Sequence, residues 1–181
     1  MAVPGGVDIV QLRDKLGTSK ETLKFSKRAL GWLRGRIPFI VNDRVDIVRI
    51  SGADGVHLGQ EDISVEEARN MLGRRKIIGK SCQTVAHVSS ACREDVDYIG
   101  FGSVFKTLTK PGRQPMDLLN LRKAAEKSCV PLFAIGGIAQ ENLGQIIACG
   151  VSRVAICRDI LLSDDVVLSV GEIKKKLKLC S

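Results

Sequence analysis

Aromatic side chains are scarce in this sequence, because one Trp, one Tyr and five Phe make up only 4% of 181 residues. So few rings offer little surface for stacking single-stranded bases, which argues against a nucleic-acid-binding domain. The chain also lacks any apolar run approaching the roughly 20 residues of a membrane span. Its first residues, Met-Ala-Val-Pro-Gly-Gly, have no signal-peptide pattern. We therefore expect a cytoplasmic protein that associates with neither membranes nor nucleic acid.

The cysteines form no C-x-x-C pair, and most of them lie among apolar residues. In such surroundings a reduced thiol behaves as a small hydrophobic side chain. The sequence therefore predicts neither a zinc site nor a disulfide framework. The six cysteines are Cys82, Cys92, Cys129, Cys149, Cys157 and Cys180.

Positive charge exceeds negative charge by 8, which favours an anionic partner. A multiply phosphorylated small molecule fits this charge, and nucleic acid is the alternative that the scarcity of rings disfavours. Part of the excess lies in residues 174–178, which we interpret as the solvated face of a last helix. The length predicts a single domain spanning residues 1–181.

Short apolar runs alternate with helix-like segments along the whole chain. Strands that alternate with helices form a parallel sheet, because parallel neighbours need a crossover connection. Capping boxes at Thr18 with Glu21, and at Ser64 with Glu67, mark two helix starts. We predict strands at residues 7–11, 37–42, 55–58, 76–80, 97–101, 131–135 and 153–157, and helices at 19–34, 44–51, 65–73, 84–94, 116–128, 140–149 and 165–178.

These segments predict an α/β fold, a TIM-type (β/α) barrel with seven β/α units. A closed barrel of this type has eight units, so the chain lacks one, which we place at the amino end as the first strand–helix unit. The gap would expose strand edges, which proteins usually cover, and a second copy of the chain in a homo-oligomer would provide such cover.

Polar residues collect where the predicted strands end, and in barrels this is the end that carries the chemistry. In the first strand, alternation places Val7, Ile9, Gln11 and Arg13 on one face, with Lys15 just beyond. If Val7 and Ile9 fill the interior, Gln11 and Arg13 point into the mouth of the barrel. Arginine and lysine there suit phosphate oxygens, although exposed strand ends also commonly carry them.

Two acidic residues follow neighbouring strands. Asp43 comes directly after Asn42 at the end of the second strand, where it could also cap the following helix. Asp62 follows the third strand, and Ser64 already supplies the cap there. Two carboxylates from adjacent strand ends can share one Mg²⁺ whose remaining ligands are water and phosphates.

The fifth strand runs into glycines and a polar loop. Gly100 and Gly102 leave space on the interior face, so that a flat ligand ring could approach the backbone. Thr107, Thr109 and Lys110 follow, and hydroxyls with an ammonium group suit an anion and a loop that closes over it.

The last two strand ends resemble the phosphate sites of barrels. Gly136 and Gly137 form a turn whose free amides could hold a phosphate, with the next helix adding its dipole. Cys157 and Arg158 stand at the final strand end. His57 lies at the third strand end, where a histidine more often packs or binds a ligand than acts as a base.

Taken in order, these segments resemble the thiamine-phosphate synthase family. The resemblance spans nearly the whole chain, and the set is specific although each piece alone is common. It rests on residues 10–15, 42–44, 53–62, 78–81, 97–102, 107–110 and 134–138.

The resemblance implies an enzyme that joins an aminopyrimidine-methyl diphosphate to a thiazole phosphate, giving thiamine phosphate and pyrophosphate. It implies Mg²⁺ at Asp43 and Asp62, and small-molecule substrates as partners. By the same resemblance, the diphosphate would contact Arg13, Lys15, Asn42 and Lys110, and the phosphate or pyrophosphate would contact Thr107 and Thr109. The pyrimidine would contact Gln11, His57 and Ser81. The thiazole phosphate would contact Gly137, Cys157 and Arg158.

The chain departs from the family pattern in three ways. Its first strand and most of its first helix are absent, Arg158 replaces a small hydroxyl residue, and Asp117 replaces a glycine. A truncated, non-catalytic paralogue that binds phosphate or thiamine is therefore one alternative. A thiazole tautomerase is another, but that relative generally lacks the metal carboxylates and uses a histidine near Ser81, where this chain has Gln83.

Overall fold

The computed structural model describes residues 2–107 and 114–178 of the chain. Its strands form one sheet in sequence order, and each strand is parallel to the next. The strands are β1 (Val10–Leu12), β2 (Phe39–Asn42), β3 (Gly55–Leu58), β4 (Ile77–Cys82), β5 (Tyr98–Phe101), β6 (Leu132–Ile135) and β7 (Val154–Ala155). The predicted fold class, with seven parallel strands alternating with helices, is confirmed.

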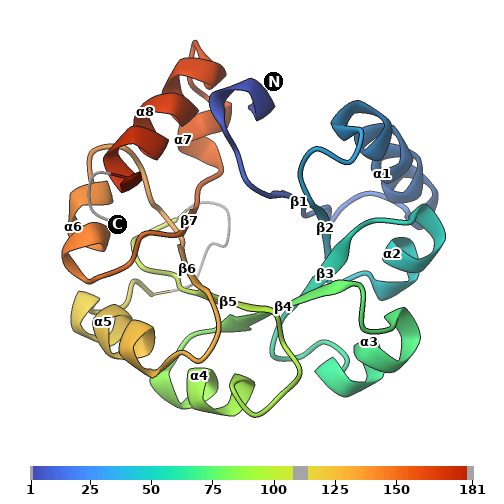
Figure 1. Cartoon of the computed structure of the whole chain (residues 1–181), viewed down its shortest axis with the longest axis horizontal. Helices are drawn as coiled ribbons and strands as arrows, with labels where there is room; N and C mark the ends of the chain where they lie inside the picture. Colours follow the sequence, from blue (N-terminus) through green and yellow to red (C-terminus); the bar gives the residue numbers. More distant parts are fainter. Residues whose placement is uncertain (1, 108–113, 179–181) are drawn as a thin grey trace.

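The helices lie around the outside of the curled sheet (Figure 1). None of the described helices combines the length and apolar character needed to cross a bilayer. The helices are η1 (Val3–Gly5, 3₁₀), α1 (Ser19–Leu33), α2 (Val45–Ser51), α3 (Val65–Leu72), α4 (Val85–Ala91), α5 (Leu118–Lys127), α6 (Leu143–Ala148), α7 (Arg158–Leu161) and α8 (Val166–Lys178).

The sheet curls without closing in the part of the chain that the structure describes, because no ladder there joins β7 to β1. The amino-terminal segment enters between α8 and α1 (Figure 1), and η1 packs against α8. The result is a barrel-like sheet whose carboxyl strand ends still meet at one mouth.

Several element bounds differ from the sequence prediction, and one helix was not predicted. The strand predicted at 7–11 is β1 at Val10–Leu12, so Val7 and Ile9 precede it and do not extend the interior face of the sheet. The helix predicted at 140–149 begins only at Leu143. The short helix α7 was not predicted at all.

Helix ends follow the predicted capping signals. The Ser64 hydroxyl accepts a hydrogen bond from the Glu67 N–H at 3.1 Å, and the Glu67 carboxylate accepts one from the Ser64 N–H at 2.9 Å. Thr18 and Glu21 form the same reciprocal pair at the start of α1. Each pair satisfies amides that have no partner within the helix, which fixes where the chain turns back onto the sheet.

The two faces of the sheet have different characters. Side chains on the outer face, such as Val56, Ile78 and Phe101, are fully buried against the helices and form the hydrophobic core. The register brings polar and small residues together on the inner face instead. Asn42 lies opposite His57, Gly79 lies opposite Tyr98, and Ser81 lies opposite Gly100. The interior of the barrel is therefore lined by groups suited to recognition.

A disulfide joins Cys92 to Cys129, whereas the sequence predicted no disulfide framework. They lie 37 positions apart in the sequence, with a Cα–Cα distance of 5.7 Å. The bond ties the end of α4 to the segment before β6. Among the described cysteines, Cys82, Cys149 and Cys157 are free.

Candidate functional site

Three charged side chains from three different strand ends meet at the mouth of the barrel. Lys15 follows β1, Asp43 follows β2 and Asp62 follows β3. The Lys15 ammonium forms an ion pair with the Asp43 carboxylate, and Asp43 in turn faces Asp62. The structure thus brings together one cation and both predicted metal carboxylates.

The surroundings of Asp62 raise the pKa of its carboxyl group above the ordinary value. Burial raises the pKa of the Asp62 carboxyl, and the adjacent Asp43 raises it further. The Gly59 N–H, which donates to Asp62 Oδ2 at 2.6 Å, and the Lys15 ammonium lower that pKa in part. A cation bound between Asp43 and Asp62 would offset the repulsion that raises the pKa of Asp62.

The donor set at this mouth fits Mg²⁺ only with help from other ligands. Within the described ranges, no group of three or more His, Cys, Asp or Glu side chains is arranged to hold a metal. Mg²⁺ is commonly bound through one or two carboxylates, with water and substrate phosphates completing its octahedron. Asp43 and Asp62 can supply those two carboxylates once Lys15 releases Asp43.

The backbone holds Asp43 in an unusual conformation. Its φ is 63°, in the left-handed region that few residues other than glycine adopt. Its N–H donates to the carbonyl oxygen of His57 at 2.8 Å. This bond links the turn after β2 to the end of β3, and the side chain of Asn42 is buried beside it.

A line of hydrogen-bonded side chains crosses the barrel interior. Tyr98 on β5 places its hydroxyl 2.9 Å from Nδ1 of His57 on β3. Nε2 of the same imidazole lies 2.8 Å from Oγ of Ser81 on β4. Gln11 on β1 donates from Nε2 to the Tyr98 hydroxyl at 3.5 Å. The three residues predicted to face the pyrimidine are therefore linked through Tyr98 in one hydrogen-bonded network. They are Gln11, His57 and Ser81.

Two glycines at the end of β5 lie close to other parts of the protein. A Cβ at Gly100 would lie 3.0 Å from Cε1 of His57, and one at Gly102 would lie 2.0 Å from the carbonyl oxygen of Ile135. Backbone already takes that space at Gly102, whereas space for a ligand ring at Gly100, beside the His57 ring, stays a prediction.

The glycine turn after β6 packs against the segment that follows β5. Gly136 and Gly137 have φ values of 103° and 61°. A Cβ at Gly137 would lie 2.4 Å from the carbonyl oxygen of Lys106. Other residues would therefore fit poorly at this turn. Helix α6 begins only at Leu143, so its amino terminus does not directly follow the turn.

The other residues predicted for the site lie at or beyond strand ends, and two of them fall outside the described ranges. Arg13 is exposed just past β1, and Thr107 is half-buried beyond β5. Cys157 is an exposed free thiol, and the exposed Arg158 begins α7, so both stand at the mouth beyond β7. Thr109 and Lys110 lie outside the described residues.

Sequence reasoning missed the role of Tyr98 and the reason for Gly79. The alternation of β5 places Tyr98 on the inner face, but its partners come from strands far away in the sequence. A Cβ at Gly79 would lie 2.1 Å from Cζ of Tyr98, so this glycine provides the space in which the phenol ring sits. The sequence signal for this packing was that the only Tyr of the chain would lie opposite a glycine on the neighbouring strand.

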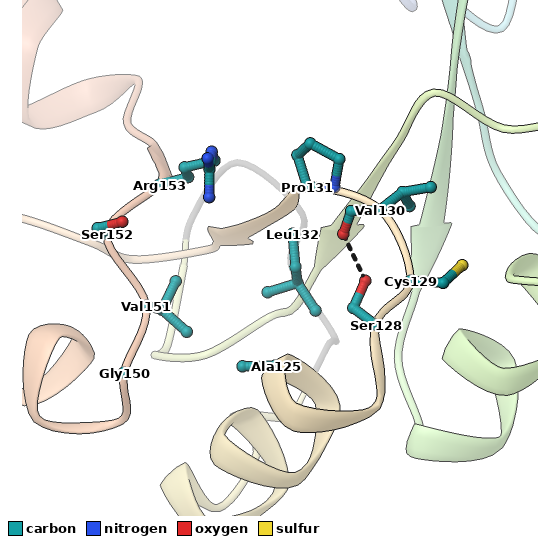
Figure 2. Close-up of a pocket in the computed structure, with 10 residues that line it drawn as sticks. All are labelled: Ala125, Ser128, Cys129, Val130, Pro131, Leu132, Gly150, Val151, Ser152 and Arg153. Atoms are coloured by element: carbon teal, nitrogen blue, oxygen red, sulfur yellow. Dashed lines mark hydrogen bonds between the residues drawn. The ribbon is translucent and has the colours of Figure 1, made fainter. Parts of the chain in front are cut away.

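Two surface hollows lie at the opposite end of the sheet. One, of about 340 Å³, is bounded by the residues before β6 and β7, including Pro131 and Arg153 (Figure 2). The other, of about 400 Å³, adjoins the starts of β2 and β4 and is lined by Arg36, Arg75 and Lys76. Neither hollow contains a residue predicted for the site. The chemistry-bearing residues lie at the carboxyl strand ends, as the parallel fold predicts.

Comparison with known proteins gives consistent matches. A family model described as thiamine monophosphate synthase matches residues 1–160. The chain is 42% identical over 165 residues to the thiamine-phosphate synthase of Gloeobacter violaceus, covering 91% of this chain and 48% of that protein. It is 37% identical over 178 residues to the thiamine-phosphate synthase of Alkaliphilus oremlandii, covering 98% of this chain and 85% of that protein.

Solved structures agree with these matches. A thiamine phosphate pyrophosphorylase from Pyrococcus furiosus superposes with a TM-score of 0.90 at 32% identity, over 99% of this chain and 87% of that one. A 3-hexulose-6-phosphate synthase matches with a TM-score of 0.71 at 16% identity, over 96% of this chain and 88% of that one, which shows the fold alone.

The chain spans about half the length of some curated relatives. The shares are 48% for the protein from Gloeobacter violaceus and 50% for the one from Thermosynechococcus vestitus.

Proposed function

Because the chain belongs to the thiamine monophosphate synthase family, we propose that it couples an aminopyrimidine-methyl diphosphate to a thiazole phosphate, releasing pyrophosphate. The residues at the carboxyl strand ends would bind the two substrates, and the domain would comprise residues 1–181. The convergence of Lys15, Asp43 and Asp62 from three strand ends is the observation that carries this proposal.

The proposed roles are those that the family resemblance implies for each residue. The diphosphate is held by Arg13, Lys15, Asn42 and Lys110, and a phosphate or the pyrophosphate is held by Thr107 and Thr109. Gln11, His57 and Ser81 face the pyrimidine. Gly137, Cys157 and Arg158 hold the thiazole phosphate. Asp43 and Asp62 bind Mg²⁺, which would neutralise charge on the leaving diphosphate. We regard Arg13, Lys15, Ser81 and Lys110 as catalytic.

The reaction needs no nucleophilic side chain. The bond between the pyrimidine methylene carbon and the diphosphate oxygen breaks, and its electron pair leaves with the diphosphate. The electron-rich aminopyrimidine stabilises the resulting cation. The lone pair of the thiazole nitrogen then forms the new C–N bond. The task of the protein is to orient both partners and to stabilise the departing charge, which cations such as Lys15 and Arg13 can do.

Lys15 could pair with Asp43 in the free protein and with a phosphate oxygen when the diphosphate is bound. In the structure it neutralises Asp43. With Mg²⁺ held by Asp43 and Asp62, the Lys15 ammonium would be available to a phosphate oxygen of the diphosphate. The side chain is half exposed, with 52% of its surface accessible, so it has room for this movement.

The direct test is turnover by the purified chain with both substrates and Mg²⁺, with thiamine phosphate measured by chromatography. We expect product formation, and a loss of about 100-fold or more for Lys15→Met, which removes charge stabilisation from the departing group. Lys174→Met is the matched control, because Lys174 pairs with Asp8 next to η1, away from the mouth. Equal activity of the two variants would contradict the role of Lys15.

Calorimetry separates the proposal from the non-catalytic alternative. A binding protein without activity would take up thiamine phosphate without turnover. A chain that neither turns over the substrates nor binds them would refute the proposal as a whole.

A further inference from the structure

Four polar side chains form a single hydrogen-bonded line in the barrel interior, and two of them are buried. His57 is 5% exposed and Tyr98 is 8% exposed. The line runs from Gln11 through Tyr98 and His57 to Ser81, with distances of 3.5, 2.9 and 2.8 Å. Buried polar groups are costly unless each donor meets an acceptor, so the protons in this line must be ordered.

The two rings at the centre of the line are held in place by their neighbours. Phe133 packs edge-on against Tyr98, with ring centroids 5.4 Å apart. Gly79 and Gly100 provide the space for the Tyr98 and His57 rings, respectively. With the rings packed in this way, the direction of each hydrogen bond depends on which atoms carry the protons.

The proton count fixes that direction. Burial raises the pKa of the Tyr98 hydroxyl far above its usual range, so the group stays neutral and has one proton to give. The Gln11 amide donates to the Tyr98 oxygen, which leaves the Tyr98 proton for Nδ1 of His57. A neutral imidazole that accepts at Nδ1 carries its proton on Nε2 and donates it to Ser81.

We propose that Tyr98 is a positioning residue that fixes the Nε2–H tautomer of His57 and thereby directs the Ser81 hydroxyl proton toward the ligand. Ser81 receives a hydrogen bond from His57, so its own proton is free to bond an acceptor in the mouth of the barrel. The matching ligand group is a heteroaromatic ring nitrogen with a lone pair. This assignment of the ligand rests on the proposed function, since an aminopyrimidine presents such nitrogens.

The tautomer can be measured directly, because the chain contains two histidines. In protein labelled with ¹⁵N-histidine, imidazole nitrogen shifts distinguish protonated from unprotonated nitrogens, and His87 in α4 is an internal reference. We expect Nε2 of His57 to carry the proton. In Tyr98→Phe we expect a mixture of both tautomers, with His87 unchanged. A proton on Nδ1 in the native protein, or an unchanged His57 spectrum in Tyr98→Phe, would overturn the proposal.

A second substitution tests the donor–acceptor direction of these hydrogen bonds and keeps the buried Tyr98 ring. Gln11→Glu replaces a donor with an acceptor of the same shape at an exposed position. The Tyr98 proton would then turn toward Glu, and Nδ1 of His57 would become protonated in order to donate to the Tyr98 oxygen. Phe133→Leu is the control for packing, and it should leave the His57 tautomer unchanged. An unprotonated Nδ1 in Gln11→Glu would refute the ordered line.

Substrate affinity provides a readout of function. Ser81→Ala should weaken binding of the aminopyrimidine diphosphate by about 10-fold, the effect of one lost hydrogen bond. Tyr98→Phe should weaken it by less, because part of the population keeps the Nε2–H tautomer. The double variant should bind no more weakly than Ser81→Ala, because both changes act on the same bond. Independent losses that multiply would refute the coupling. If the chain lacks synthase activity, the tautomer spectra still decide the proton order, so the two failures are distinguishable.

Discussion

The phenol ring of Tyr98 occupies the space that a side chain at Gly79 would need, since a Cβ there would lie 2.1 Å from Cζ of the ring. The two residues lie directly opposite each other on β4 and β5. Glycine is required here for close packing and not for a turn.

Gly79→Ala should therefore destabilise the protein. We expect a loss of about 1–3 kcal/mol in the free energy of unfolding, because a buried ring must shift to admit the methyl group. The measurement is denaturant unfolding. Gly144→Ala is the control: that glycine lies in α6 with nothing within 4 Å of its would-be Cβ, so alanine should be neutral or stabilising by up to about 1 kcal/mol. Equal stability of Gly79→Ala and the native chain would show that Tyr98 can move freely.

Asp62→Asn should impair metal use specifically. The substitution removes one of the two proposed Mg²⁺ ligands and keeps the shape of the side chain. We expect Mg²⁺ affinity and turnover at low Mg²⁺ to fall by about 10–100-fold or more, with partial recovery at high Mg²⁺. Mg²⁺ titration followed by calorimetry and by activity measures both effects.

Asp46→Asn is the matched acidic control for this experiment. Asp46 forms an exposed ion pair with Arg44 at the start of α2, and such surface pairs contribute little. An unchanged Mg²⁺ dependence in Asp62→Asn would remove this carboxylate from the metal site.

Ser64→Ala should shorten or destabilise α3. The lost capping hydrogen bond typically costs about 1 kcal/mol, measurable as a lower midpoint of denaturation. Thr18→Ala offers a comparison, because Thr18 and Glu21 form the same kind of capping box at the start of α1.

The capping box also predicts a pH dependence of stability. Hydrogen bonds from the Ser64 hydroxyl and N–H lower the pKa of Glu67 in the folded protein from its ordinary value of 4.5. The unfolded chain therefore binds more protons at acidic pH, so this contribution is full above pH 4.5 and is lost as the pH falls through the lowered pKa. Ser64→Ala should lose less stability than the native chain over that acid range. Parallel stability curves for the two proteins would contradict the linkage.

Reduction of the Cys92–Cys129 disulfide should lower the thermal midpoint. A cross-link that closes a loop of 37 residues is worth about 4 kcal/mol by restriction of the unfolded chain. Cys92→Ser should show the lower midpoint with or without reductant. Cys157→Ser is the control, since this exposed thiol is free. A native midpoint that does not respond to reductant would mean that the bond does not stabilise the fold.

The order of the elements was predictable because each apolar run ends at a polar turn. Asn42 ends β2 and His57 lies near the end of β3, both as predicted. The start of β1 was not predictable, because alternation alone continued back to Val7. Val10 instead bonds to the carbonyl oxygen of Pro38, and proline has no N–H with which to extend the ladder further. The neighbouring strand, and not the local pattern, sets the length of β1.

The contacts inside the candidate site were harder to predict than its members. Asp43 and Asp62 are conspicuous as acids after neighbouring strands, and parallel register brings such ends together. His57 and Tyr98 are 41 positions apart, and their hydrogen bond depends on ring orientation and on space left by glycines. The pairing of Cys92 with Cys129 depends in the same way on where α4 and the segment before β6 come to lie. Sequence spacing contains no direct signal of either contact.

The hydrogen bond from the Asp43 N–H to the His57 carbonyl oxygen has a geometric consequence for the two halves of a substrate. It joins, through a single backbone contact, the residue proposed to bind Mg²⁺ and the residue proposed to face the pyrimidine. The two strand ends that carry these residues are thereby held at a fixed spacing. A substrate whose ring and diphosphate were separated by one extra methylene would therefore fit the two residues less well than the proposed substrate.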